Sequence, residues 1–402
     1  MSPIKTAPAE LRADDEQLRA QYVEEVLALL YPGSGDQPVE YLVIPNARKP
    51  RLLVPADDRR VAAAAVRRYA EPQSRLARLK RDAVVTALRT GLSGLLLRDR
   101  LRLHPAADTI DAYLARALGT GLRLSVHIGP ARANRKPVLQ LLDAAGNTLA
   151  FAKLGTSALT RTLVRAEADA LAAVGSAGLS AVQVPSVLHA GQWGEHEVLV
   201  QSALPVWLPR APLTAPRLSA AMLEVARCCG TGRGTLGGSG YWARLRARLA
   251  AVADHAEGAA LRTAADRVAR VAGDVELQFG SWHGDWSPWN MASLAGAVLV
   301  WDWERFTPGV PIGFDALHHA LQLGIGRSPS AGQAVNELVA AAPDLLLPFG
   351  VVHRQAVGVT ALLYLIDLAT RYVTDRQAEA GARLGVLGSW LLPVLVARVE
   401  AL

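Results

Sequence analysis

Three short segments of the chain are rich in apolar residues, at 121–128, 137–142 and 148–154, and in the first of them apolar and polar residues alternate with a period of two. This period is typical of β-strands that bury one face, and Gly146-Asn147 supplies the tight turn expected before the third segment. The three segments therefore predict a small antiparallel sheet that is built from consecutive strands.

A helical period follows directly, because apolar side chains recur every three or four residues over 159–174. Another apolar strand is predicted at 197–204, before a proline-rich stretch that ends near Pro216. Nearer the N-terminus, 41–44 and 51–54 predict a β-hairpin. Two helices are expected after that hairpin, at 59–69 and around 73–90.

The densest group of candidate catalytic side chains lies in His283-Gly-Asp-Trp-Ser-Pro-Trp-Asn290. An apolar, β-branched strand is predicted at 297–301, and Asp302-Trp-Glu304 follows it. A short loop can place Asp285 and Asn290 on one side of a cleft, and the strand would return Asp302 to the same place. Phosphoryl transfer needs such a set, namely a carboxylate near the attacking hydroxyl and oxygen ligands for Mg²⁺.

The pattern His-x-Asp-x-x-x-x-Asn, followed by a strand that ends in Asp-x-Glu, resembles the aminoglycoside phosphotransferase and choline kinase-like enzymes, which share the protein-kinase fold. The resemblance implies that Asp285 is the catalytic base and that Asn290 and Asp302 hold Mg²⁺. It implies that His283 braces the loop, and that Asp315 is mainly structural and caps a helix at 316–323.

The same resemblance assigns the nucleotide site to the preceding half of the chain. Lys153 lies in the third predicted strand, and Glu167 lies on the following helix, placed to pair with it and align the phosphates of ATP. The chain has only five lysines, so a lysine kept in an apolar strand favours contact with phosphate. The alternative is a lysine that extends from an edge strand to solvent.

Two further segments are weaker candidates for the nucleotide site. The loop 129–136 stands where a phosphate-covering loop belongs, but it has a single glycine, so Arg132 and Asn134 would have to add side-chain contacts. A solvated hairpin tip is the alternative interpretation. The resemblance places the adenine at the backbone between Gln201 and Ala203.

These expectations define a bilobal α+β protein-kinase-like fold with an additional N-terminal α/β cap domain. The cap is expected at 1–105, the nucleotide-binding lobe at 106–204 and the helical lobe at 205–402. Gly232-Arg-Gly-Thr-Leu-Gly237 has the spacing of a dinucleotide fingerprint, but a helical pattern precedes it, so we expect a flexible loop between helices.

Composition excludes several other classes of protein. The chain has 402 residues and is 51% apolar, which is enough for two or three globular domains. No uncharged apolar run reaches the roughly eighteen residues that span a bilayer. The adjacent Cys228 and Cys229 are the only cysteines, which argues against a disulfide scaffold or a zinc site and favours the cytoplasm.

The segment 59–102 is strongly basic, with twelve arginines or lysines against three acids. A solvated helix face is the simplest interpretation, and a surface for nucleic acid, an acidic substrate or lipid is the alternative. Nucleic acid is the less favoured partner, because Tyr69 is the only aromatic residue there.

The sequence thus predicts an enzyme that transfers the γ-phosphate of Mg-ATP to a hydroxyl group of a small molecule. From 305 to 402 the acids and the arginines are equal in number, which favours a neutral or acidic acceptor over a polycation. A sugar is one candidate, with the rings of Trp286, Trp289, Trp301, Trp303 and Trp390 available to stack on it or to pack in the core. The alternatives are a protein or peptide kinase that docks its substrate on the basic extension, and an anion-binding module.

Overall fold

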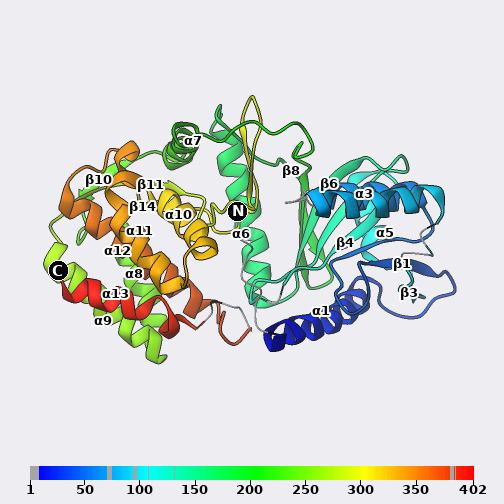
Figure 1. Cartoon of the computed structure of the whole chain (residues 1–402), viewed down its shortest axis with the longest axis horizontal. Coiled ribbons are helices and arrows are strands. Elements are labelled where there is room, and N and C mark those ends of the chain that lie inside the picture. Colours follow the sequence, from blue (N-terminus) through cyan, green and yellow to red (C-terminus); the bar gives the residue numbers. More distant parts are fainter. Residues whose placement is uncertain are drawn as a thin grey trace. The chain divides into compact units, whose positions relative to one another are not determined.

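A computed structural model gives the fold of residues 9–69, 75–92, 94, 97–106, 108–130, 132–380, 384 and 386–402, with side chains described from residue 19 onward. The chain divides into two compact units (Figure 1). Of the described residues, the sheet unit comprises those up to Arg165 and Ser186–Trp207. The helical unit comprises Ala166–Pro185 and Leu208–Leu402. Each unit is a body with its own core.

The sheet unit is built on an eight-stranded antiparallel sheet with the strand order β3-β1-β2-β4-β5-β6-β9-β8. The strands are β1 (Val39–Ile44), β2 (Leu52–Pro55), β3 (Arg100–Leu103), β4 (Arg123–His127), β5 (Val138–Leu142), β6 (Thr148–Gly155), β8 (Val187–Trp193) and β9 (His196–Ser202). The strands expected at 121–128, 137–142, 148–154 and 197–204 are therefore present. β8 was not predicted, because most of its side chains are exposed and give no apolar pattern.

Helices cover both faces of this sheet because side chains alternate along its strands. Tyr41 and Val43 of β1 pack in one core with helices α1 (Ala9–Leu30) and α5 (Ile110–Leu118). Leu42, which points to the opposite face, packs with α2 (Arg59–Tyr69) and α3 (Arg75–Thr90). The helix expected at 59–69 is confirmed, and the one expected at 73–90 is confirmed from Arg75, since 73 and 74 lie outside the described residues.

The structure does not show the expected N-terminal cap as a domain of its own. β2 pairs antiparallel with β4, with Leu52 opposite His127 and Leu53 opposite Val126. The predicted hairpin of β1 and β2 therefore extends the sheet that contains β4, β5 and β6. The physical reason is that the edge of β4 carries unpaired N–H and C=O groups, which another strand can satisfy.

The helical unit contains the second half of α6 (Ala158–Ser176), the helix expected at 159–174. Its other helices are α7 (Ala215–Arg227), α8 (Gly240–Ala251), α9 (Ala256–Ala272), α10 (Phe314–Arg327), α11 (Ala331–Leu346), α12 (Arg354–Thr374) and α13 (Leu392–Glu400). Two three-stranded sheets complete it, β10-β11-β14 and β12-β13-β7. Their strands are β7 (Val182–Gln183), β10 (Gly232–Thr235), β11 (Glu276–Trp282), β12 (Met291–Ser293), β13 (Val298–Val300) and β14 (Thr307–Pro311).

One expectation for this unit was wrong. The glycine-rich segment that begins at Gly232 is an edge strand rather than a flexible loop. Its Arg233 lies opposite Gln278 of β11, and the ladder of hydrogen bonds to β11 holds the segment extended. Glycine has a low strand propensity, so the pairing partner, and not the local sequence, determines this element.

Helix α12 is the one described helix whose length and composition would allow it to cross a membrane. Its apolar window is 78% buried inside the structure. Helices α8, α9, α10, α11 and α13 all pack against it. Burial on every side explains its apolar composition, as for the central helix of a packed core.

Because the N-terminal strands belong to the eight-stranded sheet, a core substitution in β2 should destabilise the sheet unit as a whole. Leu53 is fully buried, and we expect Leu53→Ala to lower the free energy of unfolding by about 2–5 kcal/mol. Leu76→Ala, on the exposed part of α3, is the control and should change it by less than about 0.5 kcal/mol. Denaturant unfolding followed by circular dichroism measures both. A separate early transition in Leu53→Ala, with the rest of the curve unchanged, would show an independent N-terminal domain.

Candidate active site

The β12–β13 hairpin brings the two candidate metal ligands to the same end of the helical unit's small sheet. Met291 lies opposite Val300 in the hairpin, and the N–H of Trp301 donates to the carbonyl oxygen of Asn290 at 3.1 Å. Asn290 and Asp302 therefore flank the last pair of the ladder. The structure matches the expected return of Asp302 to the loop that carries Asp285 and Asn290.

His283 is fully buried at the start of this loop and connects its two ends. The N–H of Asp285 donates to Nδ1 of His283 at 3.1 Å, so Nδ1 carries no proton. Nε2 therefore carries the proton and donates to the carbonyl oxygen of Trp301 at 3.1 Å. Burial lowers the pKa of His283 to about 4, which keeps the ring neutral. Its ring also lies edge-on to Trp303, with ring centroids 4.6 Å apart.

Asp315 has a different role from the expected helix cap. It lies in the first turn of α10, whose N-cap is Gly313, and its carboxylate accepts the N–H groups of His283 at 2.7 Å and Gly284 at 3.2 Å. Burial raises the pKa of Asp315 to about 7, although those two N–H groups act in the opposite direction. The expected helix cap is wrong because the carboxylate accepts N–H groups of a loop about thirty residues earlier in the chain, and not those at the start of its own helix.

Asp285 is held by side chains on both of its carboxylate oxygens. Oδ1 accepts from Nε2 of His318 at 3.0 Å, and Oδ2 accepts from Nδ2 of Asn290 at 3.0 Å. Nδ1 of His318 is left to accept the hydroxyl proton of Tyr364, at 3.1 Å. Burial raises the pKa of Asp285, but the hydrogen bond from His318 and the positive charge of Arg371 outweigh it and leave that pKa below its usual value. The carboxylate is thus ionised and fixed in orientation.

Asn290 presents an oxygen to the site because its nitrogen is already used. Nδ2 donates to both the backbone oxygen and Oδ2 of Asp285, each at 3.0 Å. The side chain is nearly buried, with 5% exposure. Oδ1 is the atom that remains to bind a cation.

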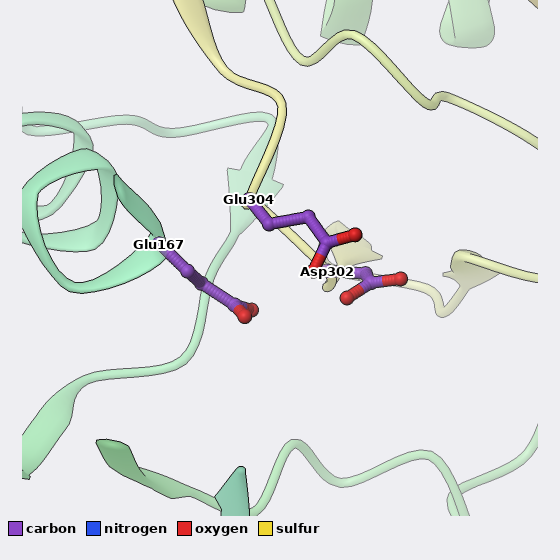
Figure 2. Close-up of side chains that lie close together, drawn as sticks. All are labelled: Glu167, Asp302 and Glu304. Carbon is purple, nitrogen blue, oxygen red and sulfur yellow. The ribbon is translucent and has the colours of Figure 1, made fainter. Parts of the chain in front are cut away.

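Three carboxylates meet beside this loop in the helical unit. Figure 2 shows Glu167 from α6 and the side chains of Asp302 and Glu304 from the segment after β13, pointing toward one another. One oxygen of each lies within 4.8 Å of the others. The N–H of Trp303, the residue between the two acids, donates to Oε1 of Glu167 at 3.2 Å and fixes the helix to this segment.

The backbone is strained at Asp302, one of the three acids of the cluster. Asp302 has a φ of 73°, in the left-handed region that non-glycine residues rarely adopt. A strained backbone that persists at a cluster of charged groups is typical of a functional site. Carboxylate oxygens are the ligands that Mg²⁺ prefers, so the cluster of Glu167, Asp302 and Glu304 fits such an ion.

The remaining predicted residues belong to the sheet unit. Lys153 on β6 is 6% exposed, and Gln201 on β9 is 5% exposed. Gln201 lies opposite Phe151, two residues before Lys153, so Lys153 and Gln201 share a face of the sheet. Ala203 is half-buried just after β9, and the loop between β4 and β5 carries an exposed Arg132 and a half-buried Asn134. The pairing of Lys153 with Glu167 stays a prediction.

Two residues of the site were not predicted, and a third, Glu304, belonged to the predicted motif but had no role assigned to it. His318 and Tyr364 support Asp285 from α10 and α12, and Glu304 joins the carboxylate cluster. Glu304 had a signal in the sequence, because an acid two residues after Asp302 extends the same motif. For His318 the only hint was its position on the helix that begins at Asp315.

The buried, neutral His283 gives the site a defined pH dependence. In the unfolded chain its pKa is near 6.5, so below that pH the unfolded state binds a proton that the folded state excludes. We expect the free energy of unfolding of the wild type to fall, relative to that of His283→Gln, as the pH drops from about 6.5 to about 4, by on the order of 3 kcal/mol. Below about 4 the difference should level off. Urea unfolding of both proteins across this range measures it, and parallel pH profiles would contradict the neutral assignment.

The carboxylate cluster predicts that divalent cations stabilise the protein. In the presence of ATP, Mg²⁺ at 100 times its Kd should stabilise the wild type by about 2.7 kcal/mol, and Asp302→Asn should lose most of this gain. Asparagine tolerates the left-handed backbone, so the substitution removes charge with little added strain. The control is Asp266→Asn on an exposed position of α9. Thermal melts with and without Mg²⁺ measure the shift, and an undiminished shift in Asp302→Asn would exclude the cluster as the metal site.

Comparisons with known proteins are limited to solved structures. No protein-family model matches the chain, and no curated protein matches it either. A ternary complex of a thermostable aminoglycoside phosphotransferase APH(4)-Ia mutant with ADP and hygromycin B matches 73% of this chain and 98% of its own, at 16% identity and a TM-score of 0.46. The enzyme APH(3'')-Id from Streptomyces rimosus, in complex with ADP and streptomycin, matches 58% of this chain and 90% of its own, at 13% identity and a TM-score of 0.39.

A glucosamine kinase in complex with glucosamine, ADP and inorganic phosphate matches 74% of this chain and 83% of its own, at 17% identity and a TM-score of 0.34. Because each of these TM-scores lies below 0.5, the functional argument rests on the side chains of the chain itself. The solved structures to which the chain is similar are small-molecule kinases, the class that its His-x-Asp-x-x-x-x-Asn motif resembles.

Proposed function

We propose that this protein is an ATP-dependent phosphotransferase that acts on a hydroxyl group of a small molecule. The observation that carries the proposal is a fixed, ionised Asp285 just before the β12–β13 hairpin, together with a carboxylate cluster formed by Asp302 and Glu304 just after that hairpin and by Glu167 of α6. A base for a hydroxyl and a cluster of hard oxygen ligands are the two parts that phosphoryl transfer requires of a protein.

Asp285 accepts the proton of the acceptor hydroxyl in this scheme. The hydroxyl oxygen forms a bond to the γ-phosphorus as the bond from that phosphorus to the bridging oxygen of ADP breaks. A lowered pKa keeps Asp285 ionised at neutral pH. His318 and Asn290 hold both carboxylate oxygens, so that little reorientation is needed when the acceptor binds.

Two groups of residues would bind the nucleotide in this proposal. Glu167, Asp302, Glu304 and Asn290 would hold Mg²⁺, which supplies positive charge that offsets the negative charge of the phosphates. Lys153 would contact the phosphates, in the role that the sequence resemblance assigns to it together with Glu167. Arg132 and Asn134 would cover the phosphates, and the backbone from Gln201 to Ala203 would bind the adenine.

Replacing the base should separate turnover from nucleotide binding. Asp285→Asn keeps the shape of the side chain but cannot accept the proton, so turnover should fall by roughly 10²–10⁴-fold. The stabilisation by Mg-ATP should remain, because the carboxylate cluster is intact. ATP consumption in the presence of sugars, amino alcohols, aminoglycosides and macrolides gives the first readout, and thermal melts give the second.

The exposed Asp344→Asn on α11 is the matched control for this substitution and should behave as the wild type. Near-normal turnover in Asp285→Asn would show that another group accepts the proton. A wild type that neither consumes ATP with any of these acceptors nor is stabilised by Mg-ATP would reject the proposed function altogether.

A further inference from the structure

A cavity of about 300 Å³ lies inside the helical unit, next to the candidate active site. Glu304 of the carboxylate cluster forms part of its wall, and so does Ala166, the neighbour of Glu167. Arg371 lines it as well and donates to the carbonyl oxygen of Gly284, the residue before Asp285. A molecule in this cavity would therefore touch residues that border both the metal cluster and the catalytic loop.

The wall of the cavity carries more arginines than acids. Its three acids are Glu304, Asp367 and Asp375, and all three pair with arginines of the wall, Glu304 with Arg305 at 3.9 Å. Arg248 pairs with Asp367 at 2.8 Å, and both terminal nitrogens of Arg305 contact the carboxylate of Asp375. Carboxylates that are already paired with arginines offer little attraction to a cationic ligand.

The two other arginines of the wall, Arg244 and Arg371, form no salt bridge with a carboxylate of the described residues, although the charge of Arg371 acts on Asp285 and Asp315. Arg244 donates to the carbonyl oxygens of Pro308 at 3.1 Å and Gly309 at 2.8 Å. Arg371 donates to a carbonyl oxygen and lies 5.8 Å from the ring of Trp282. Each guanidinium has five N–H donors, so both keep donors for an anionic group.

Aromatic side chains complete the wall. Trp282, Tyr241 and Phe306 line the cavity, and the first two are almost fully buried there. Aromatic faces beside a few charged donors are typical of small-molecule pockets, and this volume is at the lower limit for such pockets, about 300 Å³. Of the tryptophans considered for stacking on a sugar, Trp286, Trp303 and Trp390 are buried in the core, and Trp289 is 52% exposed.

We propose that this cavity binds the anionic group of the phosphate acceptor. The acceptor would then be a monosaccharide-sized polyol that carries a carboxylate or a phosphate ester. Arg244 and Arg371 would bind the anionic group, and the aromatic wall would pack against the carbon skeleton. The inference rests on the proposed function and narrows its substrate class from any hydroxylated molecule to an acidic one. A carboxylate and a phosphate monoester share this chemistry, so both must be tried.

Calorimetry with four probes tests the cavity without any turnover: glucuronate, glucose 6-phosphate, glucose and glucosamine. We expect one of the two anionic sugars to bind more tightly than glucose, and glucosamine to bind no more tightly than glucose. Arg244→Gln should weaken the binding of the anionic probe by roughly ten- to a hundredfold, as expected for the loss of a hydrogen bond to a charged group. It should leave the binding of glucose unchanged. Arg246→Gln is exposed on the same helix, does not line the cavity, and is the matched control.

A second substitution is used because Arg244→Gln could disturb β14, since the Arg244 side chain donates to carbonyl oxygens of that strand. Thr374 is exposed and lines the cavity, so Thr374→Glu adds a negative charge without opening the core. It should weaken the anionic sugar selectively and leave the melting temperature unchanged. The inference is overturned if neither anionic sugar binds more tightly than glucose, or if both substitutions leave the anionic probe unaffected.

Separate readouts distinguish this inference from the proposed function. Stabilisation by Mg-ATP reports on the nucleotide and metal site and does not depend on the acceptor. Anionic sugar binding without any Mg-ATP stabilisation would reject the kinase proposal and keep the anion site. Mg-ATP stabilisation with no preference for anionic sugars would reject the anion site and keep the kinase proposal.

Discussion

The structure depends on the close approach of like charges at Glu167, Asp302 and Glu304, whose oxygens lie within 4.8 Å of one another. Two unit charges about 4 Å apart interact by roughly 4 kcal/mol at the effective dielectric constant of a protein surface. A fold that keeps three carboxylates this close must hold them firmly, and the Mg²⁺ of the proposed function would offset their charge. The left-handed backbone at Asp302 and the hydrogen bond from Trp303 to Glu167 are the local means of holding them.

The catalytic loop beside the cluster is held by buried polar contacts instead of by local propensity. Asp315 fixes the start of the loop through two backbone N–H groups, and His283 ties the loop to the end of β13. His318 and Asn290 then orient Asp285. Each of these groups is hydrogen-bonded within the protein before any substrate arrives, so the site is organised in advance, which is the main contribution of a protein to phosphoryl transfer.

Local spacing predicted those parts of the site that lie close together in the sequence. The meeting of Asn290 and Asp302 follows from one short hairpin, and the strands at 137–142 and 148–154 follow from their apolar residues and turn. The supports of the loop could not be predicted, because His318 reaches Asp285 from thirty-three residues away and through tertiary packing. The N-terminal strands were assigned to a separate domain for the same reason, since β2 and β4 are joined by hydrogen bonds that no local pattern reveals.

The most direct measurement is the position of a divalent cation in crystals grown with Mn²⁺ and a non-hydrolysable ATP analogue, located by anomalous scattering. The account predicts an anomalous peak among the carboxylates of Glu167, Asp302 and Glu304 and the side-chain oxygen of Asn290. Crystals in which the nucleotide is bound but the manganese peak lies away from these carboxylates would contradict it.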